Sequence, residues 1–162
     1  MTNKYLPIDT ILTILRETPL RLEKLTDGLE PVQWYTAPGE GEWSVNEILA
    51  HLRACSDVWG DRYIMTILAQ DQPTIKAMNP RKWINDTDYL EQEFQLSLGA
   101  FTKQRNKLLF ILEPLPPDDW ARTNTLVGAG KPLTQTLLSH ADGLARHERT
   151  HLKQIERILN AL

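Results

Sequence analysis

The sequence has little cysteine, with Cys55 as the single example in 162 residues. One thiol cannot close an internal disulfide, and it cannot supply the several ligands that a Cys-based zinc finger or an iron–sulfur cluster requires. Such low cysteine usage is typical of a reducing compartment, so we expect a cytoplasmic protein.

Long apolar segments are also lacking. The longest uninterrupted run extends from Leu108 to Leu112, far short of the about 20 residues that cross a bilayer. The first residues, Met-Thr-Asn-Lys-Tyr-Leu-Pro, lack the apolar stretch of a signal peptide. We therefore expect no membrane-spanning segment and no secretory leader.

Neither sign of charge is in large excess. The 18 Lys and Arg residues stand against 21 Asp and Glu residues, which gives a net charge of -3. A nucleic-acid-binding protein normally carries a basic excess on at least one face. The weakly acidic balance therefore argues against a nucleic-acid partner. It gives no information about a small-molecule substrate, which is the partner we expect if the protein is an enzyme.

What is present is an ordinary globular composition, 41% hydrophobic and 24% charged. No internal repeat and no change of composition marks a second domain, and the length suits one hydrophobic core. We expect a single domain over residues 1–162.

Apolar periodicity and helix-ending residues predict four long helices. Pro19 predicts a kink or a break within the first of them, and residues 125–127 are a weak candidate for a short strand. The predicted fold class is all-α, a four-helix bundle with long connecting loops. The helices extend from about Asp9 to Leu25, from Ser44 to about Gln70, from about Asp86 to Leu112, and from Pro132 or Thr134 nearly to the end.

The second helix has the clearest start. Ser44 can cap it and Glu47, three residues later, can reach back to the Ser44 backbone, which is the capping-box pattern. Trp43 and Ile48 occupy the positions of a hydrophobic staple. This start places His51 on or beside the core face.

Three of the four histidines lie on one stripe of the last helix. His140, His147 and His151 occupy positions that steps of three and four residues connect to apolar neighbours. Buried imidazoles are unfavourable unless their ring nitrogens find partners. The apolar members of the stripe are Leu133, Leu137, Leu144, Ile155, Ile158 and Leu162.

His147 and His151 are one helical turn apart, so both can reach one ion at about 2.0–2.1 Å. Alternatively, both bond to carboxylates or backbone carbonyls of neighbouring helices. His140 lies about 10 Å further along the axis, which favours a core or supporting position. His51 is the remaining candidate ligand, although alone it would be a satisfied core histidine. Cys55 is either a neighbour of this site or a small buried hydrophobe.

These residues resemble the DinB-like family, also called DinB/YfiT-like. The segment Gly41-Glu42-Trp43-Ser44-Val45-Asn46-Glu47-Ile48-Leu49-Ala50-His51-Leu52 is similar to the family's W-S-x-x-E-x-x-x-H-L motif. Leu138-Ser139-His140 and the segment from His147 to Ile155 are similar to its H-x-x-x-H-x-x-Q ending.

The resemblance implies a four-helix bundle that binds a divalent ion, nickel or zinc, through His51, His147 and His151. Many members are dimers, so a homodimer is expected. Characterised relatives include transferases and isomerases that use a low-molecular-weight thiol, and other members are described as metal-dependent hydrolases. We therefore expect a metal-dependent S-transferase or isomerase, or a hydrolase.

Two further side chains are weak catalytic candidates. Glu47 could act as a general base beside His51, although the capping box already gives it a structural role. Gln154 could orient a ligand from behind, or it could be an ordinary interhelical amide.

Other polar groups and aromatic residues read as structural. Asp57 and Asp61 look like a solvated face, and so does the outer side of the last helix. Trp43 and Trp59 have the staple and stripe roles. The other tryptophans lie in or beside loops, where they either pack the loops on the bundle ends, the more common use, or line a substrate pocket. The outer side is formed by Glu148, Arg149, Lys153, Glu156 and Arg157.

Two rivals to an enzyme stay open. One is a non-catalytic, stress-related bundle whose metal stiffens the fold or reports metal status. The other is a metal-free interaction module whose histidines are hydrogen-bonded in the core.

Overall fold

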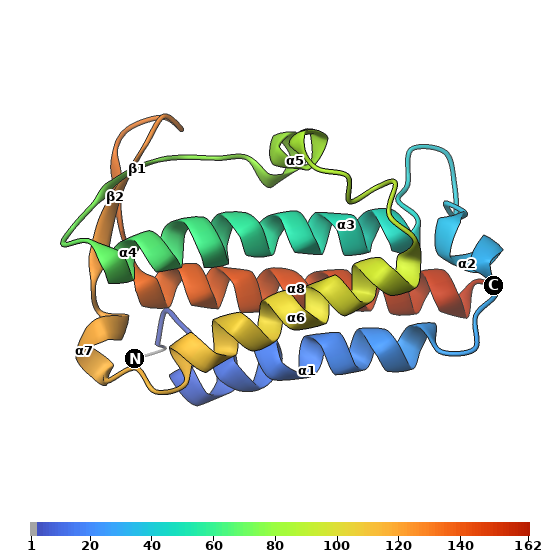
Figure 1. The fold of residues 1–162 in the computed structure, drawn as a ribbon, viewed down its shortest axis with the longest axis horizontal. Helices are drawn as coiled ribbons and strands as arrows, with labels where there is room; N and C mark the ends of the chain where they lie inside the picture. The colour runs from blue at the N-terminus through green and yellow to red at the C-terminus, as the bar shows by residue number, and fades with distance from the viewer. Residues whose placement is uncertain (1–2) are drawn as a thin grey trace.

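Four long helical segments run along the molecule in the computed structural model, which describes residues 3–162 (Figure 1). Three short α-helices and one 3₁₀ turn lie in the connections: α2 (Pro31–Tyr35), α5 (Pro80–Trp83), η2 (Ile84–Asp86) and α7 (Pro117–Trp120). The long segments are α1 (Ile8–Thr26), α3 (Val45–Cys55) continued by the π-helical η1 (Ser56–Ile64) and by α4 (Met65–Ala69), α6 (Phe94–Leu112) and α8 (Leu137–Asn160).

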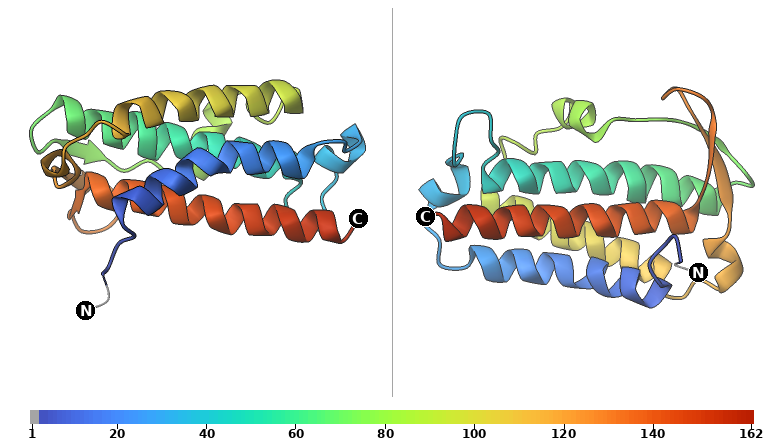
Figure 2. Two further views of the ribbon diagram at one scale, coloured as in Figure 1. Left: turned by 90° about the horizontal axis from the view of Figure 1, so that it is seen from below. Right: turned by 180° about the vertical axis from the view of Figure 1, so that it is seen from behind.

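The four segments pack as a bundle in which α8 lies between α1 and α3 (Figures 1 and 2). Helix α6 contacts α1 and α3 from a second side. The apolar stripe of each helix faces this centre and forms two clusters of buried side chains. The expected four-helix bundle is therefore present.

A small three-stranded sheet at one end corrects the all-α prediction. Its strands are β1 (Thr74–Lys76), β2 (Thr123–Val127) and β3 (Leu133–Thr136), in the order β1-β2-β3. Strand β1 is parallel to β2, and β3 is antiparallel to it. Gly128 and Gly130 adopt positive φ angles of 89° and 83° in the turn between β2 and β3. Only residues 125–127 of this sheet carried a strand signal in the sequence.

The third and fourth helices begin later than the sequence predicts. Helix α6 starts at Phe94 because the Glu93 carboxylate caps it, whereas residues 80–86 form two short turns instead. Helix α8 starts at Leu137 after the Thr136 cap. Leu133 therefore belongs to β3 and not to the core stripe of α8. It is 53% exposed.

Helix α1 continues through Pro19 without the break that the sequence allowed. Proline has no N–H, so the carbonyl of Leu15 loses its helical partner. The guanidinium of Arg105 donates to that carbonyl over 3.0 Å. A side chain of α6 thus satisfies the acceptor that Pro19 leaves free.

Arg105 also forms a buried ion pair with Glu148, which corrects the prediction that Glu148 lies on the outer face of the last helix. Both side chains are 0% exposed, and both carboxylate oxygens accept from the guanidinium. Ser56 accepts a further bond from Arg105 at 3.0 Å. Arg105, Glu148 and Ser56 thus form a buried polar layer. The sequence did not predict this layer, because no spacing within α8 reveals a partner on α6.

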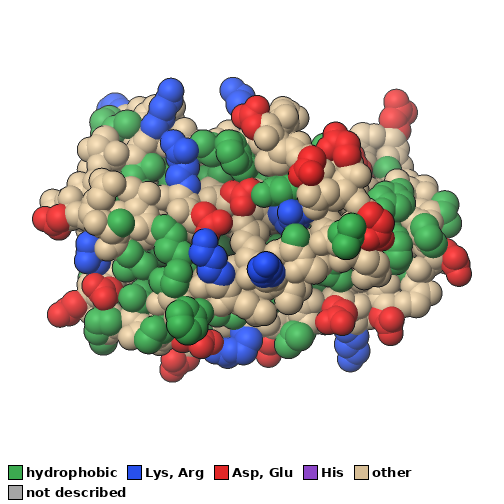
Figure 3. Space-filling model, in the orientation of Figure 1, with side chains coloured by type: hydrophobic (Ala, Val, Ile, Leu, Met, Phe, Trp, Pro, Cys, Tyr) green, Lys and Arg blue, Asp and Glu red, His purple; other side chains and the backbone are tan. Residues whose placement is uncertain are grey.

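Acidic and basic side chains are interspersed on the face shown in Figure 3, as the small net charge predicts. Across residues 3–162, no helix combines the length and the apolar character needed to cross a membrane.

Candidate metal centre

The capping box at the start of α3 positions His51. The Ser44 hydroxyl accepts from the Glu47 N–H at 3.2 Å, and the Glu47 carboxylate accepts from the Ser44 N–H at 2.7 Å. Glu47 therefore has the structural role of the capping box. Its side-chain bond is to Ser44 rather than to a histidine of the cluster, so this contact does not support Glu47 as a general base. His51 lies one turn further along α3 with 6% of its surface exposed.

Three imidazoles converge between α3 and α8. The Nε2 atom of His147 lies 3.2 Å from Nε2 of His51 and 3.1 Å from Nε2 of His151. One ligand atom from each residue lies within 4.8 Å of the others. Within residues 3–162 these histidines form the one such group, and no carboxylate or thiol belongs to it.

The spacing of the three nitrogens fits one tetrahedral ion. Ligands held at 2.0–2.1 Å in a tetrahedron lie about 3.3–3.4 Å apart. The observed separations of 3.1 and 3.2 Å are close to that edge length. The third separation, between His51 and His151, is within 4.8 Å. When the lone pairs of all three nitrogens face one another, a cation between them removes their repulsion, so the arrangement is compatible with a bound cation.

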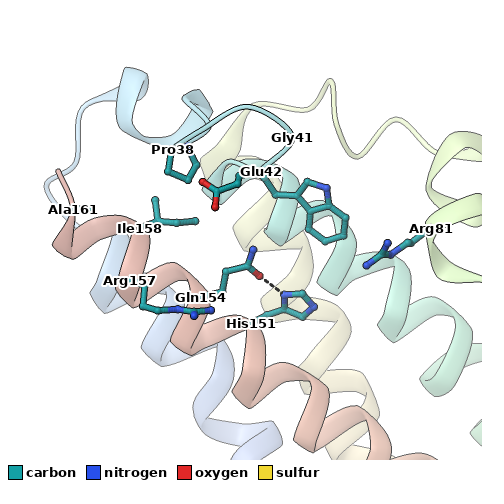
Figure 4. Close-up of a pocket in the computed structure, with 10 residues that line it drawn as sticks. Pro38, Gly41, Glu42, Arg81, His151, Gln154, Arg157, Ile158 and Ala161 are labelled. Atoms are coloured by element: carbon teal, nitrogen blue, oxygen red, sulfur yellow. Dashed lines mark hydrogen bonds between the residues drawn. The ribbon is translucent and has the colours of Figure 1, made fainter.

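Gln154 fixes the tautomer of His151. Its Oε1 lies 2.8 Å from Nδ1 of His151, and an amide oxygen can only accept (Figure 4). The hydrogen-bond network therefore places the His151 proton on Nδ1 and a lone pair on Nε2, which faces the cluster. This is the orienting contact that the spacing of Gln154 suggested.

His147 differs from His151 in this respect. Its Nδ1 is buried and has no hydrogen-bond partner within the described part of the chain. The ring is therefore positioned by packing, including Trp59, and its Nε2 is the nitrogen that meets polar neighbours.

Burial keeps the imidazoles neutral, which is the form that binds metals. Burial, followed by repulsion from His151 and Arg81, lowers the pKa of His51 to about 4. Burial and the charges of His151, His51 and Arg81 lower the pKa of His147 to about 3. The pKa of His151 is also lowered, chiefly by burial.

Two tryptophans enclose the imidazoles, a role that the sequence did not reveal. The ring of Trp43 lies 4.9 Å from that of His51 and stacks at 6.1 Å on that of His151. The ring of Trp59 meets His147 edge-on at 5.1 Å. Trp59 follows His51 by eight residues, a spacing that places both on one helix face, whereas Trp43 precedes the helix and gave no such signal.

The sequence left two roles open for Cys55, a small buried side chain or a neighbour of the site. In the structure Cys55 is buried and also lies beside the histidine cluster. Its Sγ lies 3.5 Å from Nε2 of His51. Burial raises the pKa of this thiol, which therefore stays protonated at neutral pH.

His140 lies away from the cluster, in the core position that its spacing predicted. It is 4% exposed, and its Nε2 lies 2.9 Å from Oδ1 of Asn124 in β2. The bond joins the first turns of α8 to the sheet.

Asp57 is not the solvated residue that the sequence suggested. Its carboxylate accepts from the Trp83 indole at 2.9 Å, from the Tyr89 hydroxyl at 2.7 Å and from the Gln104 amide at 2.6 Å. Tyr63 adds a hydroxyl that accepts from the Met78 N–H at 2.8 Å. These bonds fasten the connection between α4 and α6, which carries α5, against the bundle.

A pocket of about 590 Å³ opens beside the cluster (Figure 4). Its walls come from the loop before α3, from α5 and from the end of α8. The residues that line it are Pro38, Gly41, Glu42, Trp43, Arg81, His151, Gln154, Arg157, Ile158 and Ala161.

Fold and site together define a helical-bundle protein with a three-histidine candidate metal centre. The model of one protein family, described as the DinB superfamily, matches residues 14–155. The chain belongs to this superfamily, as the motifs around His51 and His147 indicated.

Among solved structures, the chain is similar to one described as "YfiT from Bacillus subtilis is a probable metal-dependent hydrolase with an unusual four-helix bundle topology". The TM-score is 0.80 at 18% sequence identity, and the match covers 98% of this chain and 90% of that one. At this identity the similarity shows the fold. The search of curated proteins found no match.

Proposed function

We propose that this protein is a metal-dependent enzyme that acts on a small molecule through an ion held by His51, His147 and His151. The observation that carries the proposal is the convergence of three Nε2 atoms, two of them 3.1 and 3.2 Å from the third. The description of YfiT as a probable metal-dependent hydrolase supports it. Three protein ligands leave a position for water or substrate, as catalytic sites do.

When bound, a divalent ion supplies a Lewis acid that lowers the pKa of a thiol or a water beside it. Residues around the three histidines orient and enclose the rings that would bind this ion. Gln154 holds the His151 proton on Nδ1, so that Nε2 is free to bind. Trp43 and Trp59 pack on the rings and restrict water around them.

Two reactions suit such a site. In the first, the ion held by His51, His147 and His151 would lower the pKa of a low-molecular-weight thiol. The thiol would lose its proton to solvent, and its sulfur would displace a leaving group from an electrophile, as in an S-transferase, or add to the substrate and leave again, as in an isomerase. This chemistry needs no reactive cysteine in the chain, and Cys55 is buried and protonated. In the second, water replaces the thiol and the protein is a hydrolase, as the description of YfiT suggests for that protein.

The finer properties of the proposal rest on the family resemblance and on composition. We propose nickel or zinc as the ion, because borderline metals suit imidazole ligands. We further propose a homodimer located in the cytoplasm, with residues 1–162 as one domain.

Elemental analysis of untagged protein, grown with nickel and zinc supplements, tests the metal site. We expect about one ion per chain, and a content near zero in the His147→Ala variant. A content near zero in the wild-type protein would overturn the proposal and favour a metal-free module.

Activity separates an enzyme from a metal-stiffened bundle. The metal-loaded protein is assayed with a panel of thiols and electrophiles, and with a panel of esters and amides. Turnover in either panel that disappears in His147→Ala is the expected result. Turnover that survives this substitution, or a loaded protein inert in both panels, would contradict the proposed function.

A further inference from the structure

The candidate metal centre includes no negatively charged ligand from the described residues that would offset the charge of an ion. The three imidazoles are neutral ligands, and no carboxylate belongs to their group within residues 3–162. Glu148, adjacent to His147 in sequence, is fully engaged by Arg105. A divalent ion at this place would therefore keep its full positive charge.

Arg81 adds a second positive charge on the same side. Its guanidinium carbon lies 5.1 Å from the centre of the Trp43 ring, and that ring packs on the rings of His51 and His151. Figure 4 shows Arg81 pointing from α5 toward His151 across the pocket.

The guanidinium of Arg81 has no anionic partner in the described chain. None of the five ion pairs among residues 3–162 includes Arg81 or Arg157, the other arginine that lines the pocket. The backbone at Arg81 is held in place, because Asn79 caps α5 and Trp83 bonds to Asp57. The Arg81 side chain itself is exposed and lies over the Trp43 ring. A guanidinium that faces a pocket without an anionic partner is a binding group for an oxyanion.

We propose that the pocket binds a small molecule with a carboxylate, which Arg81 receives while the reacting part of the molecule lies at the three histidines. This inference rests on the proposed function and names its substrate class. The side chains that line the pocket include two arginines and one carboxylate, that of Glu42, so the lining carries a net positive charge even before an ion binds and favours an anion. Guanidinium and carboxylate match as a planar, two-bond pair.

The test uses the cobalt(II)-loaded protein and measures the visible spectrum of cobalt during titration with acetate. We expect acetate to bind, and the Arg81→Gln variant to bind it about 10- to 100-fold more weakly because a charge-assisted bond is lost. Arg81→Lys should fall between the two. The matched control is Lys82→Gln, which removes the same charge from the next residue of α5, and its affinity should stay within about twofold of wild type.

Each other outcome has a definite meaning. Equal acetate affinity in Arg81→Gln and wild type, with cobalt still bound, would overturn the inference and leave the proposed function standing. Tighter binding of phosphate than of acetate, or of acetamide as strongly as acetate, would overturn the carboxylate assignment. Failure of the wild-type protein to bind cobalt would overturn the proposed function and this inference with it.

Discussion

The hydrogen bond between Nδ1 of His151 and Gln154 determines which nitrogen of the His151 ring faces the cluster. The bond between His151 and Gln154 is local, because the two residues are three positions apart on one helix. The contact between His51 and His147, in contrast, joins residues that are 96 positions apart. An inward histidine with an acceptor behind it is a ligand prepared in the correct tautomer. His147, one helical turn earlier, has no hydrogen-bond acceptor at its Nδ1 within the described chain.

Replacing Gln154 with Leu should weaken zinc binding about 10- to 100-fold, because the His151 ring is no longer held with Nε2 facing the cluster. Competition with a chelating dye measures this affinity. Gln154→Glu keeps an acceptor at the same place and serves as the control. Equal affinity in the Leu variant would show that Gln154 is only an interhelical amide.

His140 should make the stability of the metal-free protein depend on pH. Burial lowers its pKa from 6.5 to about 4, so below pH 6.5 the unfolded chain takes up a proton that the folded chain refuses. This contribution to stability is complete above pH 6.5 and is lost as the pH falls toward 4. At 1.36 kcal/mol per pH unit it amounts to about 3 kcal/mol.

The measurement is the free energy of unfolding in urea between pH 7 and pH 4, with and without His140→Gln. The amide of glutamine can still donate to Asn124 but does not titrate, so the variant's curve should be flatter. Parallel curves for the two proteins would show that His140 does not carry the dependence.

At the scale of the elements, the polar layer between α6 and α8 decides how these helices fit together. Arg105 donates to Glu148 on α8, to Ser56 on η1 and to the Leu15 carbonyl on α1. One side chain of α6 thus contacts the other three long segments. Helical periodicity does not predict this layer. Charged residues are usually exposed, so the pattern placed Glu148 on the solvent face of the last helix.

Replacing Arg105 with Met should destabilise the fold by about 3–5 kcal/mol, because Glu148 remains buried without its counter-charge. The double variant Arg105→Met with Glu148→Leu should recover much of this loss, since no buried charge is left. Urea denaturation of both variants measures the difference. A single variant as stable as the wild type would contradict the buried pair.

The starts of the helices show where local sequence is sufficient. The start of α3 was predicted correctly because Ser44 and Glu47 satisfy each other within four residues. The start of α6 was placed too early because residues 87–93 form turns instead of helix, and these turns are held by tertiary contacts such as the bond from Tyr89 to Asp57. The strands were largely missed because β1 pairs with a segment about fifty residues away.

At the scale of the whole molecule, a bound ion should lock two helices of the bundle together. His51 comes from α3, and His147 and His151 come from α8. An ion that binds only the folded chain adds about 2.7 kcal/mol at one hundred times its dissociation constant. For a chain of this size that corresponds to about 5–11 °C in Tm.

Thermal scans of the zinc-loaded protein and of the protein stripped with a chelator test this effect. The expected result is a lower Tm after stripping and recovery after zinc is restored. His147→Ala should give the same Tm in both conditions. A Tm that does not change on stripping the wild-type protein would contradict a metal site shared by α3 and α8.

The sequence by itself determined the bundle and placed two of the three candidate ligands on one helix face. Helical periodicity, the capping box at Ser44 and the spacing of His147 and His151 are local patterns, set by residues within a few turns of one another. The family motifs then added His51 on another helix. The superfamily match over residues 14–155 agrees with that interpretation.

Only the tertiary structure decided what surrounds the ligands. Arg81 and Trp43 reach the histidines from a connection and a loop, Asp57 anchors that connection, and Glu148 finds Arg105 across the core. These pairs join residues far apart in the chain, so no helical or strand period encodes them. Their positions result from packing the elements in three dimensions, which creates the pocket and its charge.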